Sequence, residues 1–206
     1  MYAEAALQLN CSAVIHYRKA KMPDVFLKPP PLGIMLRRWR TLHRIKQIHA
    51  AELFGVTQST ISRWEAGSLD VGPMERAHIE KLLSARLDSA ADAALARLVN
   101  GSSRPVHLVC DLTHRLLACS PARASEFAVP VSELLGRSLL RFATQEILQK
   151  ESALDDLGWR ENAAPPSLEF PSGTNDSTII PIRQSICRWT RLTLADGTAA
   201  RLVETL

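Results

Sequence analysis

The stretch GVTQSTISRWEAG, residues 55–67, has two chemically different sides when it is written as a helix. Gly55 can adopt the left-handed conformation that ends a preceding helix, and the hydroxyl of Thr57 can cap the next one. Small polar residues and an arginine then fall on one side, while Ile61 and Trp64 fall on the other. We expect the apolar side to anchor this helix in a core and the polar side to contact a regular polar surface.

Further helices are predicted on both sides of this stretch. A helical pattern begins near Leu32, and a second helix is expected from about Gln47 to Phe54. Pro73 suits the first turn of a fourth helix, and the helical signal continues to about Val99, with a break at Asp88 as an alternative. In this helical segment, the spacing typical of a short coiled-coil seam is found at Leu83, Leu87, Ala90 and Ala94. This stripe could pack on its own domain or form a dimer seam.

The positive charge lies in the first half of the chain. Residues 1–100 hold 14 Lys and Arg against 9 Asp and Glu, whereas residues 101–206 hold 11 against 12. The densest cluster consists of Arg37, Arg38, Arg40, Arg44 and Lys46. This distribution favours a polyanion partner for the first half alone, although a solvated helix face would show the same pattern.

The bulk composition excludes several classes of protein. No apolar run approaches the roughly 20 residues of a membrane helix, and the N-terminus lacks the pattern of a secretory signal, so we expect a cytoplasmic protein without membrane association. The four scattered cysteines (Cys11, Cys110, Cys119 and Cys187) are expected to be reduced thiols. No Gly-rich phosphate loop, nucleophile motif or convincing carboxylate pair is present, so no enzymatic activity is expected.

The segment KQIHAAELFGVTQSTISRWEAG (Lys46–Gly67) closely resembles the helix-turn-helix of the phage repressor and Cro family, also called the XRE family. The resemblance covers about Leu32 to Leu83 and implies a compact bundle of four or five helices. It also implies that the N-terminal part of the third helix enters the major groove of double-stranded DNA. His43 departs from the pattern, because the family often has glycine at the end of the first helix.

The resemblance also implies roles for individual residues. The residues expected to contact DNA bases are Gln58, Ser59, Ser62 and Arg63. Glutamine can bond bidentately to adenine and arginine to guanine, although Arg63 could bind phosphate instead. The residues expected to contact DNA phosphates are Gln47, Thr57, Thr60, Arg37, Arg38 and Arg44. Arg40 and Glu65 match a structural pair that ties the first helix to the end of the third.

The second half changes character after the turn NGSSRP (Asn100–Pro105). Short strands VHLVC and RLLACS are followed by brief helices at Pro121–Phe127 and Val131–Leu135, and by a longer helix across Leu139–Ser152. The strand candidates at the end are SLEF, TIIPIRQSICRWTRLTL and TAARLVETL, with ADG as a hairpin turn between the last two.

The segment Val106–Leu140 resembles the beginning of a PAS domain, and the later strands fit the last three strands of that fold. Ser120 replaces the asparagine expected after the second strand. PAS domains are implied to sense small molecules, bind haem or flavin, or dimerise. His107, Cys110, His114 and Cys119 lie close in sequence, but their spacings are unlike a standard zinc motif. We expect no metal or cofactor and favour a dimerisation module, with a small-molecule sensor as the alternative.

Together these observations predict an α+β protein: an all-α helix-turn-helix bundle followed by a PAS-like domain with an antiparallel sheet and flanking helices. The expected function is a homodimeric DNA-binding transcription regulator, most simply a repressor, that reads an inverted repeat. The alternative is a protein-interaction module, an antitoxin or adaptor, in which DNA binding is secondary. The predicted units are an N-terminal extension (1–31, with a helical turn at Ala3–Leu9), the helix-turn-helix domain (32–87), a connecting helix and linker (88–103) and the PAS-like domain (104–206).

Overall fold

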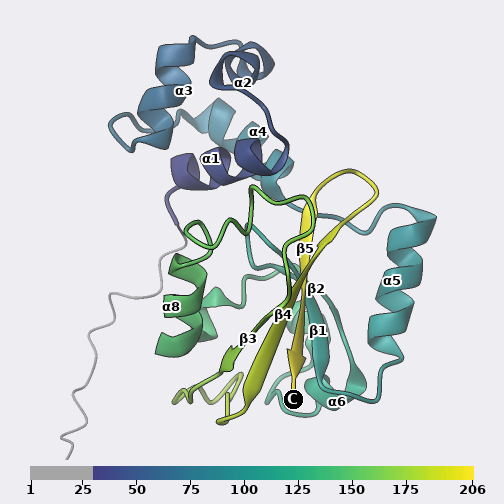
Figure 1. The fold of residues 1–206 in the computed structure, drawn as a ribbon. Coiled ribbons are helices and arrows are strands. Elements are labelled where there is room, and N and C mark those ends of the chain that lie inside the picture. The colour runs from purple at the N-terminus through teal and green to yellow at the C-terminus, as the bar shows by residue number, and fades with distance from the viewer. Residues whose placement is uncertain (1–29) are drawn as a thin grey trace, which may run out of the picture.

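The computed structural model describes residues 30–206, in which helices come first and a sheet follows (Figure 1). The expected turn at Ala3–Leu9 and the thiol of Cys11 lie outside these residues. The first four helices are α1 (Leu32–Leu42), α2 (Gln47–Phe54), α3 (Gln58–Glu65) and α4 (Pro73–Leu83). Within residues 30–206, no helix combines the length and the apolar character that crossing a membrane requires.

Local signals set the ends of these helices. Gly55 has a φ of 65° and closes α2, and Thr57 Oγ1 accepts a hydrogen bond from the Thr60 N–H at the start of α3. Helix α1 packs against α3 and α4. The approach is close at Gly33, where a Cβ atom would lie 1.8 Å from the backbone oxygen of Trp64. The bundle therefore depends on a residue without a side chain at this crossing.

The helical signal after Pro73 is interrupted, as the alternative with a break predicted. Helix α4 ends at Leu83, and α5 (Ala90–Asn100) begins after Ser89. A capping box starts α5, because Ser89 accepts from the Asp92 N–H and Asp92 accepts from the Ser89 N–H. A continuous coiled-coil seam through Leu83, Leu87, Ala90 and Ala94 is therefore wrong, and Leu83 is instead buried in the core.

The second half contains one antiparallel sheet in the strand order β2-β1-β5-β4-β3. Its strands are β1 (Val106–Cys110), β2 (Leu116–Cys119), β3 (Leu168–Pro171), β4 (Ile186–Thr193) and β5 (Ala199–Thr205). The helices between β2 and β3 are α6 (Pro121–Ala124), α7 (Val131–Leu134), a 3₁₀ helix (Leu140–Phe142) and α8 (Gln145–Ser152). The predicted antiparallel sheet with flanking helices is confirmed, and the sheet has five strands.

Two predicted boundaries in this half are wrong. The helix expected across Leu139–Ser152 is divided, because the Thr144 side chain caps α8 by accepting from the Ile147 N–H. The strand expected from residue 178 begins only at Ile186. The preceding residues form a loop held by the Asn175 side chain, which donates to the Ile180 carbonyl and accepts from the Ile182 N–H.

The two faces of the sheet are covered differently. Helix α5 packs on β1 and β2 on one face, and α8 lies on the other side of the sheet (Figure 1). Alternate residues of each strand point to opposite faces. On β5, Ala200 and Leu202 join the core beneath α5, whereas Arg201 and Val203 face the side of α8.

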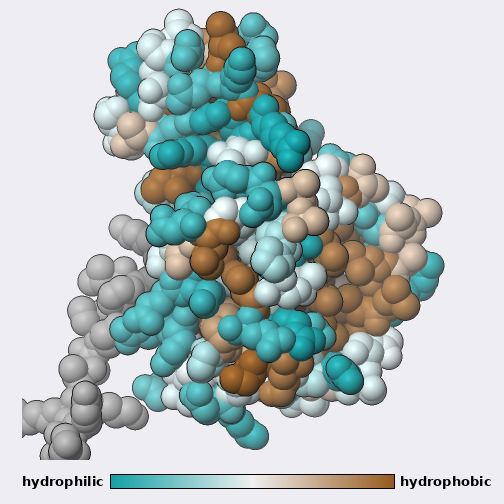
Figure 2. Space-filling view, viewed as in Figure 1, coloured by the Kyte–Doolittle hydropathy of each residue, from teal (hydrophilic) through white to brown (hydrophobic). Residues whose placement is uncertain are grey.

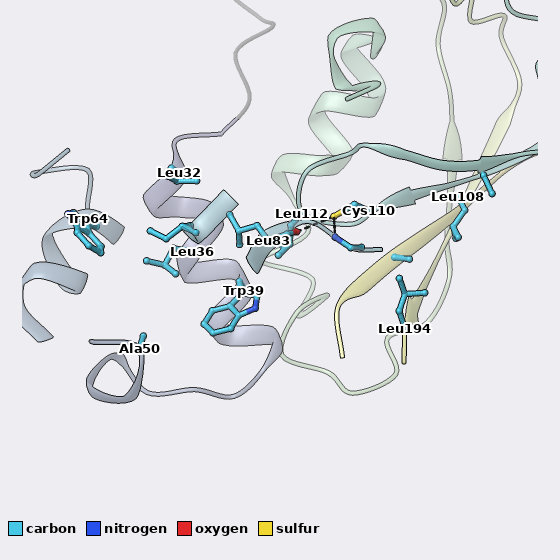
Figure 3. Close-up of a cluster of buried hydrophobic side chains, with 14 of the residues drawn as sticks. Leu32, Leu36, Trp39, Ala50, Trp64, Leu83, Leu108, Cys110, Leu112 and Leu194 are labelled. Atoms are coloured by element: carbon cyan, nitrogen blue, oxygen red, sulfur yellow. Dashed lines mark hydrogen bonds between the residues drawn. The ribbon is translucent and has the colours of Figure 1, made fainter. Parts of the chain in front are cut away.

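The helical bundle and the sheet share one hydrophobic core. Leu36, Trp39 and Trp64 pack on the bundle side, and Leu108 and Leu194 on the sheet side, with Leu83, Cys110 and Leu112 between them (Figure 3). The Cys110 thiol donates to the Leu83 carbonyl at 3.3 Å and accepts from the Ala85 N–H at 3.5 Å. The end of α4 is thereby joined to the end of β1.

Candidate nucleic-acid interface and cavity

One side of α3 is polar and open to solvent. Among the residues expected to contact bases, Gln58, Ser59, Ser62 and Arg63 are all exposed. The opposite side of α3 packs in the core, since Ile61 is completely buried and Trp64 is 4% exposed. Arg63 Nε lies 3.3 Å from the Ser59 carbonyl, so this side chain lies back along its own helix. The structure thus places the four residues on one accessible side of one helix.

The hydroxyls of Thr57 and Thr60 lie at the N-terminus of α3. Thr57 Oγ1 is 2.8 Å from Ser59 Oγ and 2.9 Å from Thr60 Oγ1, and it accepts from the Thr60 N–H at 3.2 Å. Thr57 is exposed and Thr60 is half-buried. Both residues therefore stabilise the start of the helix and lie beside its exposed side.

A buried carboxylate ties α1 and α2 to the end of α3. Arg40 donates from Nε to Glu65 Oε1 at 2.8 Å and from Nη2 to Oε2 at 3.0 Å. Arg40 Nη1 also donates to the Ile45 carbonyl at 2.9 Å. The Gln47 side chain donates to Glu65 Oε2 at 2.9 Å. Its amide is therefore used inside the bundle, and the N-terminus of α2, where Lys46 makes no side-chain cap, offers its free backbone N–H groups.

The three arginines expected to contact phosphate differ in exposure. Arg37 and Arg44 are exposed, whereas the Arg38 side chain is only 11% exposed. Arg38 Nη1 lies 3.6 Å from Glu151, and Nη2 lies 3.4 Å from Asp155. These carboxylates belong to α8 and the turn after it, so Arg38 has partners within the protein. The Arg38 guanidinium is thus directed at carboxylates of the protein, whereas Arg37 and Arg44 are open to solvent.

A network of buried charges extends from Arg38 into the sheet. Glu151 lies 2.7 Å from Arg201 Nη1, 3.3 Å from Arg160 Nη2 and 3.2 Å from His114 Nε2. Burial acts to raise the pKa of Glu151, but its interactions with Arg201, His114 and Arg160 outweigh burial and hold the pKa well below its usual range. Arg201 also donates from Nε to Asp111 at 2.8 Å. Sequence reasoning missed this network, because its members are scattered along the chain with no motif.

A cavity of about 450 Å³ lies on the α8 side of the sheet. Its apolar wall includes Val109, Leu139, Phe142, Ile180, Trp189 and Val203, and its polar lining includes His107, His114, Arg123, Ser172 and Arg201. Nδ1 of His107 and Nε of Arg123 are buried without a hydrogen-bond partner in the described part of the chain. Burial, assisted by the charge of Arg123, lowers the pKa of His107 to about 3. His107 is therefore neutral at physiological pH.

The thiols and imidazoles near β1 and β2 have separate roles. Cys110 faces the helical bundle, whereas His107 and His114 line the cavity. In residues 30–206, no three His, Cys, Asp or Glu side chains are arranged to hold a metal ion. Cys110, Cys119 and Cys187 are buried free thiols. Burial raises the pKa of Cys119 and of Cys187 to about 11, so both thiols are protonated at neutral pH.

Comparison with solved structures finds similarity to sensory domains over about half of the chain. The PAS domain of an HTR-like protein from Haloarcula marismortui matches with 15% identity and a TM-score of 0.40, covering 56% of this chain and 96% of that one. The PAS domain of Bordetella pertussis BvgS matches with 15% identity and a TM-score of 0.35, covering 55% and 82%. A sensory box sensor histidine kinase from Vibrio cholerae matches with 12% identity and a TM-score of 0.35, covering 56% and 91%.

These similarities concern the fold alone. No protein-family model matches the chain, and no curated protein matches it.

Proposed function

We propose that this protein is a non-enzymatic, sequence-specific DNA-binding regulator that acts as a homodimer, with its second half serving dimerisation and signal sensing. The observation that carries the proposal is the exposed polar side of α3, supported by buried Ile61 and Trp64. Such a helix fits the major groove, whose width admits an α-helix. In this arrangement Gln58 and Arg63 read base edges, and Ser59 and Ser62 lie beside them.

Rigidity of the reading helix supports the same function. The Glu65 carboxylate accepts from both Arg40 and Gln47, so α1, α2 and the end of α3 are held together. A side chain that reads a base must be placed accurately, and a helix supported by buried partners provides that placement. Phosphate contacts are assigned to exposed Arg37 and Arg44, to Thr57 and Thr60, and to the backbone N–H groups of Gln47 and its neighbours.

Dimerisation is expected because one such helix contacts only a few base pairs. Two copies on half-sites about one helical turn apart would supply the required specificity. Figure 2 shows apolar atoms gathered where α5 meets the sheet. Leu98 of α5 is 74% exposed, and Leu95, Leu192 and Leu202 are only partly buried in the core beneath α5. We propose that a second copy covers this surface, which would place two reading helices on an inverted repeat and block a promoter.

The test of DNA reading is selection of bound sequences from genomic fragments by the full chain, followed by gel shifts on the selected site. Gln58→Ala should lower affinity for that site by about 5- to 150-fold and relax preference at one base pair. Arg44→Gln should weaken binding to all sequences and reduce the salt dependence. Gln149→Ala on the exposed surface of α8 is the matched control. The double variant Gln58→Ala with Arg63→Ala tests the whole proposal. If it binds the selected site with unchanged affinity and selects an unchanged sequence, the proposal is excluded.

The test of dimerisation is sedimentation velocity of the full chain. Leu98→Glu should shift the protein to monomer and weaken binding to the whole inverted repeat more than to a half-site. Leu157→Glu replaces a leucine that is 49% exposed on another part of the surface, and it should remain dimeric. A wild-type chain that stays monomeric when bound to its selected site would contradict the homodimer.

A further inference from the structure

Four residues that line the cavity carry a buried side-chain nitrogen without a hydrogen bond, and two of these nitrogens, His114 Nε2 and Arg201 Nη2, lie in ion-pair contact with Glu151 and Asp111. The other two, His107 Nδ1 and Arg123 Nε, have neither a hydrogen-bond partner nor an ion-pair partner in residues 30–206. His107 is 8% exposed and Arg123 is 9% exposed. Helix α6, which carries Arg123, contacts β1, which carries His107. Buried polar groups nearly always have partners, so two such nitrogens on residues that line one cavity indicate a group that arrives from outside.

The charge of the cavity favours an anion. Its charged lining consists of Arg123, Arg183 and Arg201 against Glu126 alone. Arg201 is already neutralised by Asp111 and Glu151, and Arg183 is exposed. Arg123 contacts Glu126 through Nη1, but the Glu126 side chain is 39% exposed and leaves the Nε edge of the guanidinium free. This free edge is the available cationic donor.

The rest of the lining favours an apolar body on that anion. Leu139, Phe142 and Ile180 line the cavity together with other apolar side chains, and its volume of about 450 Å³ lies in the range of small-molecule sites. A planar guanidinium matches the geometry of a carboxylate, whose oxygens accept hydrogen bonds. The neutral imidazole of His107, in the tautomer with its proton on Nδ1, can donate a second hydrogen bond.

We propose that the cavity binds a small carboxylic acid with an apolar body, whose carboxylate accepts hydrogen bonds from Arg123 Nε–H and His107 Nδ1–H. This inference rests on the sensing role in the proposed function and names the chemical class of the signal. The apolar body lies against Leu139, Phe142 and Ile180. The carboxylate provides the partner that these two nitrogens lack within residues 30–206.

The experiment compares octanoate with octanamide, two probes of the same chain length that differ in the charge of the head group. Binding to the full-length protein is measured by calorimetric titration and saturation-transfer NMR. Octanoate should bind at least tenfold more tightly than octanamide. Arg123→Gln should abolish this preference while octanamide binding remains, which shows that the cavity is still folded. His107→Leu should weaken octanoate several-fold.

Two further variants locate the site. Arg137→Gln removes an exposed arginine outside the cavity and should leave both affinities unchanged. Leu139→Trp fills the cavity and should abolish binding of both probes. The proposal is overturned by equal affinity for the two probes, by a preference that persists in Arg123→Gln, or by the absence of octanoate binding.

The same samples separate this inference from the proposed function. None of the variants changes α3, so gel shifts on the selected site report DNA reading independently. Sequence-specific DNA binding without octanoate binding would reject the carboxylate ligand alone. Octanoate binding without sequence-specific DNA binding would reject the DNA-reading function alone.

Discussion

The guanidinium of Arg38 in α1 lies 3.6 Å from the carboxylate of Glu151 in α8, and the same carboxylate lies 2.7 Å from Arg201 of β5. Arg201 and His114, which also contacts Glu151, line the cavity. One buried carboxylate therefore contacts both the helical bundle and the cavity wall. A change in the position of Glu151 would alter the contact between the proposed DNA-reading half and the proposed sensing half.

Arg38→Met should loosen α1 from α8. Arg38 makes one hydrogen bond to the partly exposed Asp155 and a longer contact with Glu151. We therefore expect the substitution to lower the free energy of unfolding by about 1 kcal/mol or less. Amide hydrogen exchange should become faster in α1, while the strands remain protected. Arg37→Met, at an exposed position of the same helix, is the control. Identical exchange in the two variants would show that the Arg38 contact does not hold α1.

Arg201→Met should destabilise the sheet half strongly. Arg201 is 1% exposed and Asp111 is completely buried, so the substitution leaves two carboxylates, Asp111 and Glu151, without a main partner. Removing one member of such a buried pair costs about 3–5 kcal/mol. Urea unfolding followed by tryptophan fluorescence measures the loss. The double variant Asp111→Leu with Arg201→Met should cost less than the sum of the single variants, and simple additivity would argue against the direct pair.

Gly33→Ala should weaken the helical bundle. The new Cβ would lie 1.8 Å from the Trp64 carbonyl oxygen, and a backbone atom at the α1–α3 crossing can move only if the helices separate. Overpacking of this kind costs about 1–3 kcal/mol. Gly72→Ala is the matched control, because its Cβ would meet only the flexible end of the Glu75 side chain. Equal melting temperatures for the two variants would contradict the close approach of α1 and α3.

Acidification should destabilise the protein through His107. Its pKa is about 3 in the folded chain, against an ordinary value of 6.5, because burial and the charge of Arg123 oppose protonation. Between these two values the unfolded chain binds more protons at this residue than the folded chain does. The contribution of His107 to the free energy of unfolding is therefore fully present above pH 6.5 and is lost as the pH falls. One such group contributes a slope of about 1.4 kcal/mol per pH unit.

The measurement for His107 is the free energy of unfolding in urea at several values between pH 7 and pH 5. His107→Gln removes the titrating group and should flatten the pH dependence, whatever its effect on absolute stability. His49→Gln, at an exposed position, should retain the wild-type slope. The lowered pKa of His43, caused by burial and partly opposed by Asp196, acts in the same direction and remains in both variants. An unchanged slope in His107→Gln would contradict a neutral buried imidazole.

The local sequence predicted most of the secondary structure, because the signals act over a few residues. Gly55 ends α2 and Thr57 caps α3, as their side chains and conformational preferences dictate. The polar and apolar sides of α3 followed from the spacing of Ile61 and Trp64. The errors lie where a loop side chain competes with a periodic pattern, as at Thr144 and Asn175.

Only the tertiary structure decided which charges are free and which are buried. Arg38 and Arg37 are adjacent in a basic cluster, yet Arg38 contacts Asp155, a residue 117 positions away. Arg201 and Asp111 are 90 positions apart and meet because antiparallel pairing places the start of β5 beside the end of β1. The cavity likewise brings together residues that are distant in the chain, such as His107 and Arg201. Sequence periodicity places a side chain on one side of its own element, whereas the packing of elements distant in the chain determines what that side chain contacts.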